Sequence, residues 1–264
     1  MSQKPSGDFV EVLAETAWRN VEEGYYDGLE DVDKRGSSFK AAIERARGRA
    51  IIAEIKPASP SAGVLRKYTE EEALGIALEM VEGGAAALSI LTEPRIFNGS
   101  LRVFQEVRKA LDTPLLMKDI VVSGKQVEAA SRVGADAILL IAALFNRGLC
   151  EEGLDEMIDK AHDAGLEVLL ETHSGEEFEQ ALRSEADMIG INNRNLATLE
   201  VNLETTPQLL AGRRVDRVVV SESGIESAED IRRLRMAGVD AFLVGTSIMR
   251  STDVRAKVRE LAEA

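Results

Sequence analysis

Cysteine and histidine are scarce in this sequence, which has one cysteine, Cys150, and two histidines, His162 and His173. A lone cysteine cannot form an internal disulfide, and no Cys/His cluster has the spacing of a metal site. Cys150 has no basic neighbour placed to activate its thiol, so we expect it to be inert. His162 falls in a helical pattern and His173 lies past a predicted strand, and neither is assigned to catalysis. The cysteine content favours a reducing compartment.

Long hydrophobic runs are also missing. No apolar stretch approaches the length that a membrane span requires. The first residues, MSQKPSGD, lack the basic and then apolar regions of a signal peptide. We therefore expect a cytoplasmic protein that does not bind membranes.

Positive charge is in deficit. The chain has 32 Lys and Arg residues against 46 Asp and Glu residues, a formal net charge of −14. Nucleic acid is therefore not an expected partner, because binding a phosphate backbone needs a basic surface. A small anionic substrate remains compatible, since a few lysines and backbone N–H groups can create a local positive potential in one cleft.

What the sequence does contain is a repeated pattern over 264 residues, a length typical of a single α/β barrel. A helical stretch ends in glycine, and a small or acidic residue and then an apolar run follow. The pattern appears in MVEGGAAALSIL (80–91), SRVGADAILLIA (131–142), AHDAGLEVLLET (161–172) and RMAGVDAFLVG (235–245). The glycines, Gly84, Gly134, Gly165 and Gly238, suit the left-handed position that ends a helix.

The apolar runs do not alternate with polar residues, which is typical of parallel strands buried on both faces. Eight such runs, separated by helical patterns, predict a (β/α)₈ TIM barrel. They are Ile51–Ile55, Ala86–Leu91, Leu115–Lys118, Ala137–Ile141, Glu167–Glu171, Met188–Asn192, Arg217–Val220 and Ala241–Val244. The competing doubly wound sheet is disfavoured because no G-x-G-x-x-G follows the first run.

Residues 1–48 precede the first strand and are expected to form a helical extension that packs on the catalytic barrel of residues 49–264. Two helices are predicted in this extension, and a polar link, GYYDGLEDVDKRG (24–36), is expected to be mobile. The residues that indicate the helices by their spacing are Phe9, Leu13, Ala17 and Val21, with Trp18 beside them, and then Phe39 and Ile43.

Polar residues with chemical uses stand at the carboxyl ends of these strands, where barrels of this kind place their active sites. Glu54 and Lys56 are two residues apart, so both point to the same side of an extended strand. Alone, they would suggest a structural ion pair. Together with Lys118, Glu171 and Glu222 at other strand ends, they favour acid–base catalysis, because clustered acids and amines shift one another's pKa values.

The last two strands end in small residues that favour phosphate binding. Ser223-Gly224 and Gly245-Thr246 could present backbone N–H groups to a phosphate, as the final strands of many barrels do. Tight turns alone would also explain these glycines. If Gly245 contacts phosphate, a bulky side chain there should raise KM more than it lowers kcat.

Taken together, the segments from about Phe39 to Met249 resemble the indole-3-glycerol-phosphate synthase family. The resemblance lies in IIAEIKPASPSAG, LSILTEPRIFNGS, LLMKDIVV, GADAILLIAAL, VLLETHS, IGINNRNLATLEV, VSESGI and AFLVGTSIMR, which follow the family's order and spacing. It implies the substrate 1-(2-carboxyphenylamino)-1-deoxyribulose 5-phosphate and the products indole-3-glycerol phosphate, carbon dioxide and water. It implies no cofactor or metal, and it makes other tryptophan-pathway enzymes candidate protein partners.

The resemblance also implies residue roles. Lys118 would be the general acid at the ketose carbonyl, Glu171 the acid–base group of the dehydration, and Lys56 its proton donor, although the residues leave open which lysine donates there. The positions assigned to substrate are Glu54, Asn192 and Glu222 for the ribulose hydroxyls, Ser59 and Arg194 for the anthranilate end, Phe97, Leu139 and Leu196 for the ring, and Ser223, Gly224, Gly245 and Thr246 around the phosphate. Ile120 departs from the family, which usually has phenylalanine there.

Three alternatives remain open from the residues alone. A Schiff-base aldolase would use Lys118 or Lys56 as a nucleophilic amine. Another phosphate-binding barrel enzyme, such as an isomerase, would not need two lysines beside Glu171 and Asn192. A barrel that binds its ligand without turnover would not need the acid–base set at all.

Overall fold

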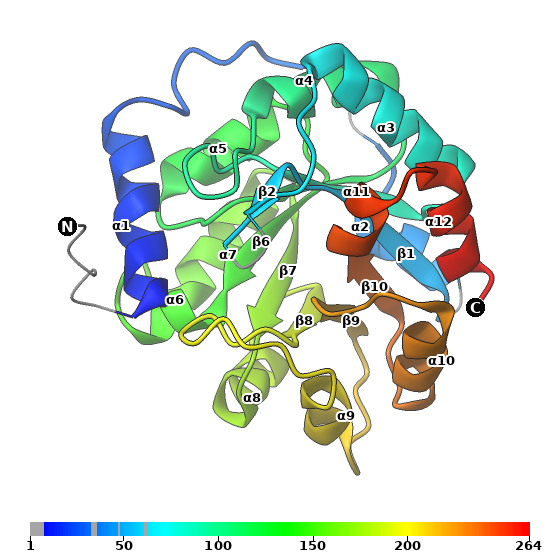
Figure 1. Cartoon of the computed structure of the whole chain (residues 1–264). Coiled ribbons are helices and arrows are strands. Elements are labelled where there is room, and N and C mark those ends of the chain that lie inside the picture. Colours follow the sequence, from blue (N-terminus) through cyan, green and yellow to red (C-terminus); the bar gives the residue numbers. More distant parts are fainter. Residues whose placement is uncertain (1–7, 33–35, 47, 61–62) are drawn as a thin grey trace, which may run out of the picture.

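The computed structural model describes residues 8–32, 36–46, 48–60 and 63–264, and its central feature is a closed barrel of eight parallel strands (Figure 1). The strands follow one another around the ring in chain order, and the first pairs with the last. They are β1 (Ala50–Ile55), β4 (Ala87–Leu91), β5 (Leu115–Lys118), β6 (Ala137–Ile141), β7 (Glu167–Thr172), β8 (Met188–Asn192), β9 (Val218–Glu222) and β10 (Ala241–Val244). The predicted (β/α)₈ barrel is confirmed.

The predicted strands agree closely with the observed ones. Four of them have the predicted bounds, and the other four differ by one or two residues at one or both ends. The largest difference is in β9, which continues to Glu222 and so places this carboxyl group within the strand. The predicted glycines Gly84, Gly134, Gly165 and Gly238 all have positive φ angles, between 75° and 103°.

Helices surround the ring (Figure 1). They are α3 (Glu70–Glu82), α4 (Leu101–Ala110), α5 (Gly124–Arg132), α6 (Ala142–Asn146), α7 (Leu154–Asp163), α8 (Gly175–Arg183), α9 (Thr205–Leu210), α10 (Ala228–Met236), α11 (Thr246–Arg250) and α12 (Val254–Ala262). A short antiparallel pair, β2 (Ala58–Ser59) and β3 (Gly63–Val64), follows β1. Reciprocal side-chain caps fix several helix starts: in α3, Thr69 accepts from the Glu72 backbone while the Glu72 side chain accepts from the Thr69 backbone.

Two helices precede the barrel, as predicted. In α1 (Phe9–Glu22), Leu13, Ala17 and Val21 are buried, and the helix lies alongside α6 (Figure 1). The second helix, α2 (Phe39–Arg45), contacts β1, β4 and β9. Its Lys40 backbone N–H donates to Glu167, the first residue of β7, so α2 lies at the amino end of the barrel.

The link between these helices is anchored at its start. Tyr25 donates its hydroxyl hydrogen to the Thr92 carbonyl at 2.9 Å, and Tyr26 donates to Asp119 Oδ1 at 3.0 Å. Tyr26 is buried. The predicted mobility therefore does not hold for this part of the link, and residues 33–35 lie outside the described residues. Within the described part of the chain, none of the helices is long and apolar enough to cross a membrane.

Candidate active site

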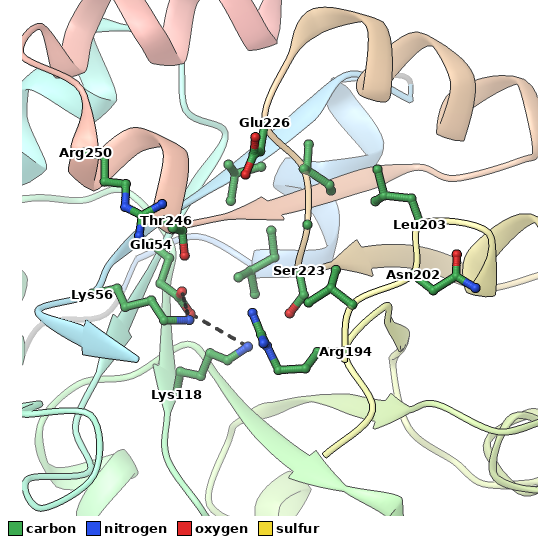
Figure 2. A pocket seen from close by; sticks show the side chains of 16 residues that line it. Glu54, Lys56, Lys118, Arg194, Asn202, Leu203, Ser223, Glu226, Thr246 and Arg250 are labelled. Atoms are coloured by element: carbon green, nitrogen blue, oxygen red, sulfur yellow. Dashed lines mark ion pairs between the residues drawn. The ribbon is translucent and has the colours of Figure 1, made fainter. Parts of the chain in front are cut away.

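The carboxyl ends of the strands bring Lys118 together with three carboxyl groups. Its Nζ lies 2.7 Å from Glu222 Oε2, 3.7 Å from Glu54 Oε1 and 3.9 Å from Glu171 Oε2. Lys56, just past β1, reaches Glu54 Oε2 at 3.1 Å. Figure 2 shows the two lysine side chains converging on Glu54. Five residues predicted from four separate strand ends thus meet at one place.

Two glycines make room for the carboxyl groups of this cluster. A Cβ atom at Gly190 would lie 2.4 Å from Glu222 Oε1, and one at Gly245 would lie 2.3 Å from Glu54 Oε2. Both distances are far below van der Waals contact, so any side chain at these positions would displace a carboxyl group. Gly245 therefore supports the position of Glu54, and a side chain there is expected to lower kcat as well as raise KM.

The charges in the cluster stabilise one another. Burial opposes the charged form of Lys118, but Glu222, Glu54 and Glu171 outweigh it and raise the pKa of the ammonium group. Burial also opposes the charged form of Glu54, yet the attraction of Lys56 and Lys118 prevails and lowers the pKa of that carboxyl group. Lys118 is therefore a cation and Glu54 an anion at neutral pH.

Glu171 differs from Glu54 in the direction of its pKa shift. Burial and repulsion by Glu222 raise its pKa to about 7, although Lys118 and Asn192 act in the opposite direction. Asn192, at the end of β8, donates its side-chain amide to Glu171 Oε1 at 2.9 Å. A carboxyl group that gains and loses a proton near neutral pH is suited to acid–base catalysis.

A cavity of about 590 Å³ lies beside the cluster, over the ends of β9 and β10. Ser223 and Gly224 follow β9 with positive φ angles of 67° and 80°. Thr246 and Arg250, both in α11, face the cavity from the other side (Figure 2). The predicted phosphate residues Gly224, Gly245 and Thr246 all line this cavity.

A second, narrower cavity of about 70 Å³ has a largely apolar wall. The three side chains predicted to hold an aromatic ring, Phe97, Leu139 and Leu196, line it together with Ile120. Ser59, Glu171 and Asn192 also line it, and Phe9 and Leu13 of α1 complete it. We call it the apolar cavity.

The two cavities meet at the cluster. Lys56, Lys118, Arg194 and Ser223 line both of them. Glu222 lines neither, and it touches the site through Lys118. A ligand with an anionic end and an aromatic end could therefore occupy both cavities and place its middle against Lys118.

Sequence reasoning missed two contributors to the cavities. Arg250 adds a cation to the larger cavity, and its position four residues after Thr246 on the same helix could have indicated it. Phe9 lines the apolar cavity, but its side chain was predicted only to pack α1 on the barrel.

The two histidines, which were not assigned to catalysis, have structural partners. His173 bonds through Nδ1 to the Asn192 carbonyl at 2.7 Å, and His162 pairs with Asp187 at 3.0 Å. Burial raises the pKa of the Cys150 thiol to about 12, so it stays protonated and unreactive at neutral pH.

Comparisons of the sequence with known proteins agree with one another. A family model described as indole-3-glycerol phosphate synthase matches residues 13–261. The protein of that name from Methanocaldococcus jannaschii is 44% identical over 87% of this chain and 86% of its own length. The one from Geobacillus thermodenitrificans is 43% identical, covering 84% of this chain and 85% of its own.

Solved structures with lower sequence identity share the fold. A chain of the tryptophan synthase a2b2 complex from Pyrococcus furiosus aligns with a TM-score of 0.61 and 15% identity, covering 83% of this chain and 99% of that one. Thiamine phosphate pyrophosphorylase from the same organism aligns with a TM-score of 0.57 and 20% identity, covering 83% and 96%. At these identities the likeness is one of architecture alone.

Proposed function

Because the chain belongs to the indole-3-glycerol phosphate synthase family, we propose how its own residues carry out that family's reaction. The enzyme is a decarboxylating carbon–carbon lyase of tryptophan biosynthesis. It converts 1-(2-carboxyphenylamino)-1-deoxyribulose 5-phosphate into indole-3-glycerol phosphate, carbon dioxide and water.

The substrate spans both cavities. Its phosphate lies in the larger cavity, against the backbone N–H groups of Gly224, Gly245 and Thr246, with Arg250 nearby as a cation. Its anthranilate ring lies in the apolar cavity, and Arg194 and Ser59 are placed to bind the ring carboxylate. This orientation brings the ketose carbonyl to the lysines.

Lys118 acts in ring closure. The ring carbon that bears the carboxylate attacks the ketose carbonyl carbon, and the ammonium group of Lys118 gives a proton to the oxygen as negative charge develops there. Loss of carbon dioxide from the same ring carbon then restores aromaticity. The raised pKa keeps Lys118 protonated before the step, as a general acid must be.

The dehydration step uses Lys56 and Glu171. Lys56 protonates the new hydroxyl group, which leaves as water, and Glu171 removes a proton from the neighbouring methylene to form the indole double bond. Glu54 and Asn192, which line the cavities, bind the ribulose hydroxyls. Glu54 orients Lys56, and Glu222 orients Lys118. Support for this assignment comes from the proximity of Glu171 to Asn192 and of Lys56 to Glu54.

The position of Lys118 Nζ, within 3.9 Å of three carboxyl groups at the junction of the cavities, carries the proposal. We predict that Lys118→Ala lowers kcat by about 10²- to 10⁴-fold, the usual contribution of a general acid. Binding of indole-3-glycerol phosphate should stay within a few-fold of the parent. A fluorescence assay of this product measures both. Lys125→Ala, at an exposed position in α5, is the control, and near-native kcat in Lys118→Ala would refute the assignment.

The Schiff-base alternative has less support. A nucleophilic amine must be neutral, which requires a lowered pKa, whereas the surrounding carboxylates raise the pKa of Lys118. Borohydride treatment in the presence of substrate should therefore give no covalent adduct on Lys118.

We also propose the domain division, the location and the partners of the protein. Residues 1–48 form an extension and residues 49–264 the catalytic barrel, a division supported by the packing of α1 and α2, with residues 1–7, 33–35 and 47 outside the described residues. A cytoplasmic location is supported by the single cysteine, and the absence of nucleic-acid partners by the net charge of −14. Contacts with other tryptophan-pathway enzymes are proposed from the shared pathway.

A further inference from the structure

The apolar cavity has one wall on a loop, residues 92–99, which joins β4 to α4. Phe97 of this loop lines the cavity together with Phe9 and Leu13 of α1. A loop can present an aromatic side chain at a defined position only if its backbone is held in place. The contacts that hold it involve Glu93 and Asn20, two buried polar residues to which the reaction assigns no role.

Glu93 organises the loop from inside. The residue is 1% exposed. Its Oε2 accepts the backbone N–H groups of Ile96 at 2.6 Å and Phe97 at 3.1 Å, and its Oε1 accepts that of Arg95 at 2.8 Å. Its backbone carbonyl accepts the N–H of Gly99 at 2.7 Å. The loop is thus folded around one carboxyl group, and the position of Phe97 depends directly on it.

Asn20 ties this folded loop to α1. It is also 1% exposed, and both ends of its amide are used. Nδ2 donates to Glu93 Oε1 at 3.0 Å, and Oδ1 accepts from Arg95 Nε at 2.6 Å. Arg95 also pairs with Glu23, just past the end of α1. Because a buried amide with both ends satisfied allows little displacement, the helix and the loop are held in a fixed relation.

We infer that Asn20 and Glu93 are positioning residues that fix the shape of the apolar cavity by holding Phe97 and α1 together around it. The inference rests on the proposed function, in which this cavity takes the aromatic end of the substrate. Asn20 lines neither cavity, and Glu93 lines only the apolar cavity. Loosening this tether should therefore weaken binding of the aromatic end and leave the phosphate end and the acid–base step intact.

The test separates the two ends of the substrate. Anthranilate serves as the probe of the aromatic end and inorganic phosphate as the probe of the other. In Asn20→Ala, we expect KM and the Kd of anthranilate to rise about tenfold, the effect of losing one or two buried hydrogen bonds. The Kd of phosphate and kcat should change less than about threefold. Unchanged anthranilate affinity in a folded Asn20→Ala protein would overturn the inference.

A matched control is available on the same helix. Trp18 donates its indole N–H to the Leu149 carbonyl at 2.9 Å, so Trp18→Phe weakens the docking of α1 without touching the loop. If both variants raised the anthranilate Kd equally, a general loosening of α1 would explain the effect and the specific inference would fail.

If Asn20→Ala does not fold, Asn20→Asp replaces it. This change keeps the size of the side chain and the acceptor for Arg95, but it sets a carboxyl group against Glu93 in place of the donor. The same selective loss of anthranilate binding is expected, and its absence would again overturn the inference. Failure of the proposed function would look different, because the unmodified protein would then form no indole-3-glycerol phosphate.

Discussion

Glu171 has an environment that sets the pH at which the enzyme can work. Its pKa, raised to about 7 by burial and by Glu222, means that the carboxylate form is lost as pH falls below neutrality. If this form is the base of the dehydration, kcat/KM should rise about tenfold per pH unit below 7 and level off above it. Measuring kcat/KM between about pH 5 and pH 9 tests this, and a flat profile would count against it.

Two variants identify the group that causes the pH dependence of kcat/KM. Asp119 is another buried carboxyl group at a strand end, and burial raises its pKa to about 6. Asp119→Asn should keep the rise of kcat/KM toward pH 7, whereas Glu171→Gln should lose both this rise and most of the activity. If the residual kcat/KM of Glu171→Gln still rose toward pH 7, the pH dependence would belong to another group.

Gly245 allows a second prediction about a single residue. In Gly245→Ala, the new Cβ would meet Glu54 Oε2 and force Glu54 away from Lys56. A displacement of about 1 Å in a catalytic site can cost about 10²-fold in rate, so we expect kcat to fall by at least tenfold. Steady-state kinetics would show this, and an increase in KM with kcat unchanged would contradict it. Thr246→Val leaves Glu54 untouched and removes only a hydroxyl group, so it should raise KM with kcat unchanged if this hydroxyl group also binds the phosphate.

Single residues also show how far the sequence could be used. The acid–base set could be predicted because each member stands at the carboxyl end of a parallel strand, where side chains must converge. The role of Gly245 could not, because the clash that excludes a side chain involves Glu54, which lies 191 positions earlier in the chain. A raised pKa at Glu171 likewise depends on a neighbour from another strand.

Among the secondary-structure elements, one buried carboxyl group, that of Asp136, joins α4, β5 and the link before α2 at the amino end of the barrel. Arg108 of α4 is fully buried and donates to Asp136 Oδ2 at 2.9 Å. Asp136 also accepts the backbone N–H groups of Gly36 and Leu115 at 2.8 Å each. Three segments thus depend on a carboxyl group far from the catalytic cluster.

We predict that Arg108→Met lowers the free energy of unfolding by about 3–5 kcal/mol, because it leaves a buried carboxylate without its cation. Activity per folded molecule should be unchanged. Urea unfolding gives the first quantity and kcat the second. Lys109→Ala, which removes an exposed pair with Glu106, should change stability by less than about 0.5 kcal/mol. If Arg108→Met and Lys109→Ala lowered the free energy of unfolding equally, burial of the Arg108–Asp136 pair would have no special effect on stability.

The elements were predictable where their signals are local. The glycine that ends a helix and the apolar run that follows it lie within a dozen residues, so the barrel strands could be placed closely. The anchoring of Tyr25 and Tyr26 was not predictable, because their partners, Thr92 and Asp119, belong to strand ends far along the chain. Local composition suggested a mobile polar link, and long-range hydrogen bonds overrode it.

For the whole molecule, a ligand that occupies both cavities should stabilise the entire barrel against unfolding. Indole-3-glycerol phosphate at about 100 times its Kd should add about 2.7 kcal/mol to the free energy of unfolding. For a chain of 264 residues, this corresponds to a rise in Tm of about 5 °C. Lys118→Ala should keep most of this rise, since the residue acts mainly in the chemical step. A thermal scan with no shift at that concentration would indicate that the cavities do not take this ligand.

The pairing of β1 with β10 also has a consequence for biosynthesis. The ring is complete only when residues 241–244 hydrogen-bond to residues 50–53, and the ribosome makes these two segments on the order of ten or more seconds apart. Until then, β1 has an unpaired edge that could recruit another chain. A nascent or prematurely ended polypeptide that lacks β10 would keep this edge open, so the final strand protects the newly made protein against aggregation.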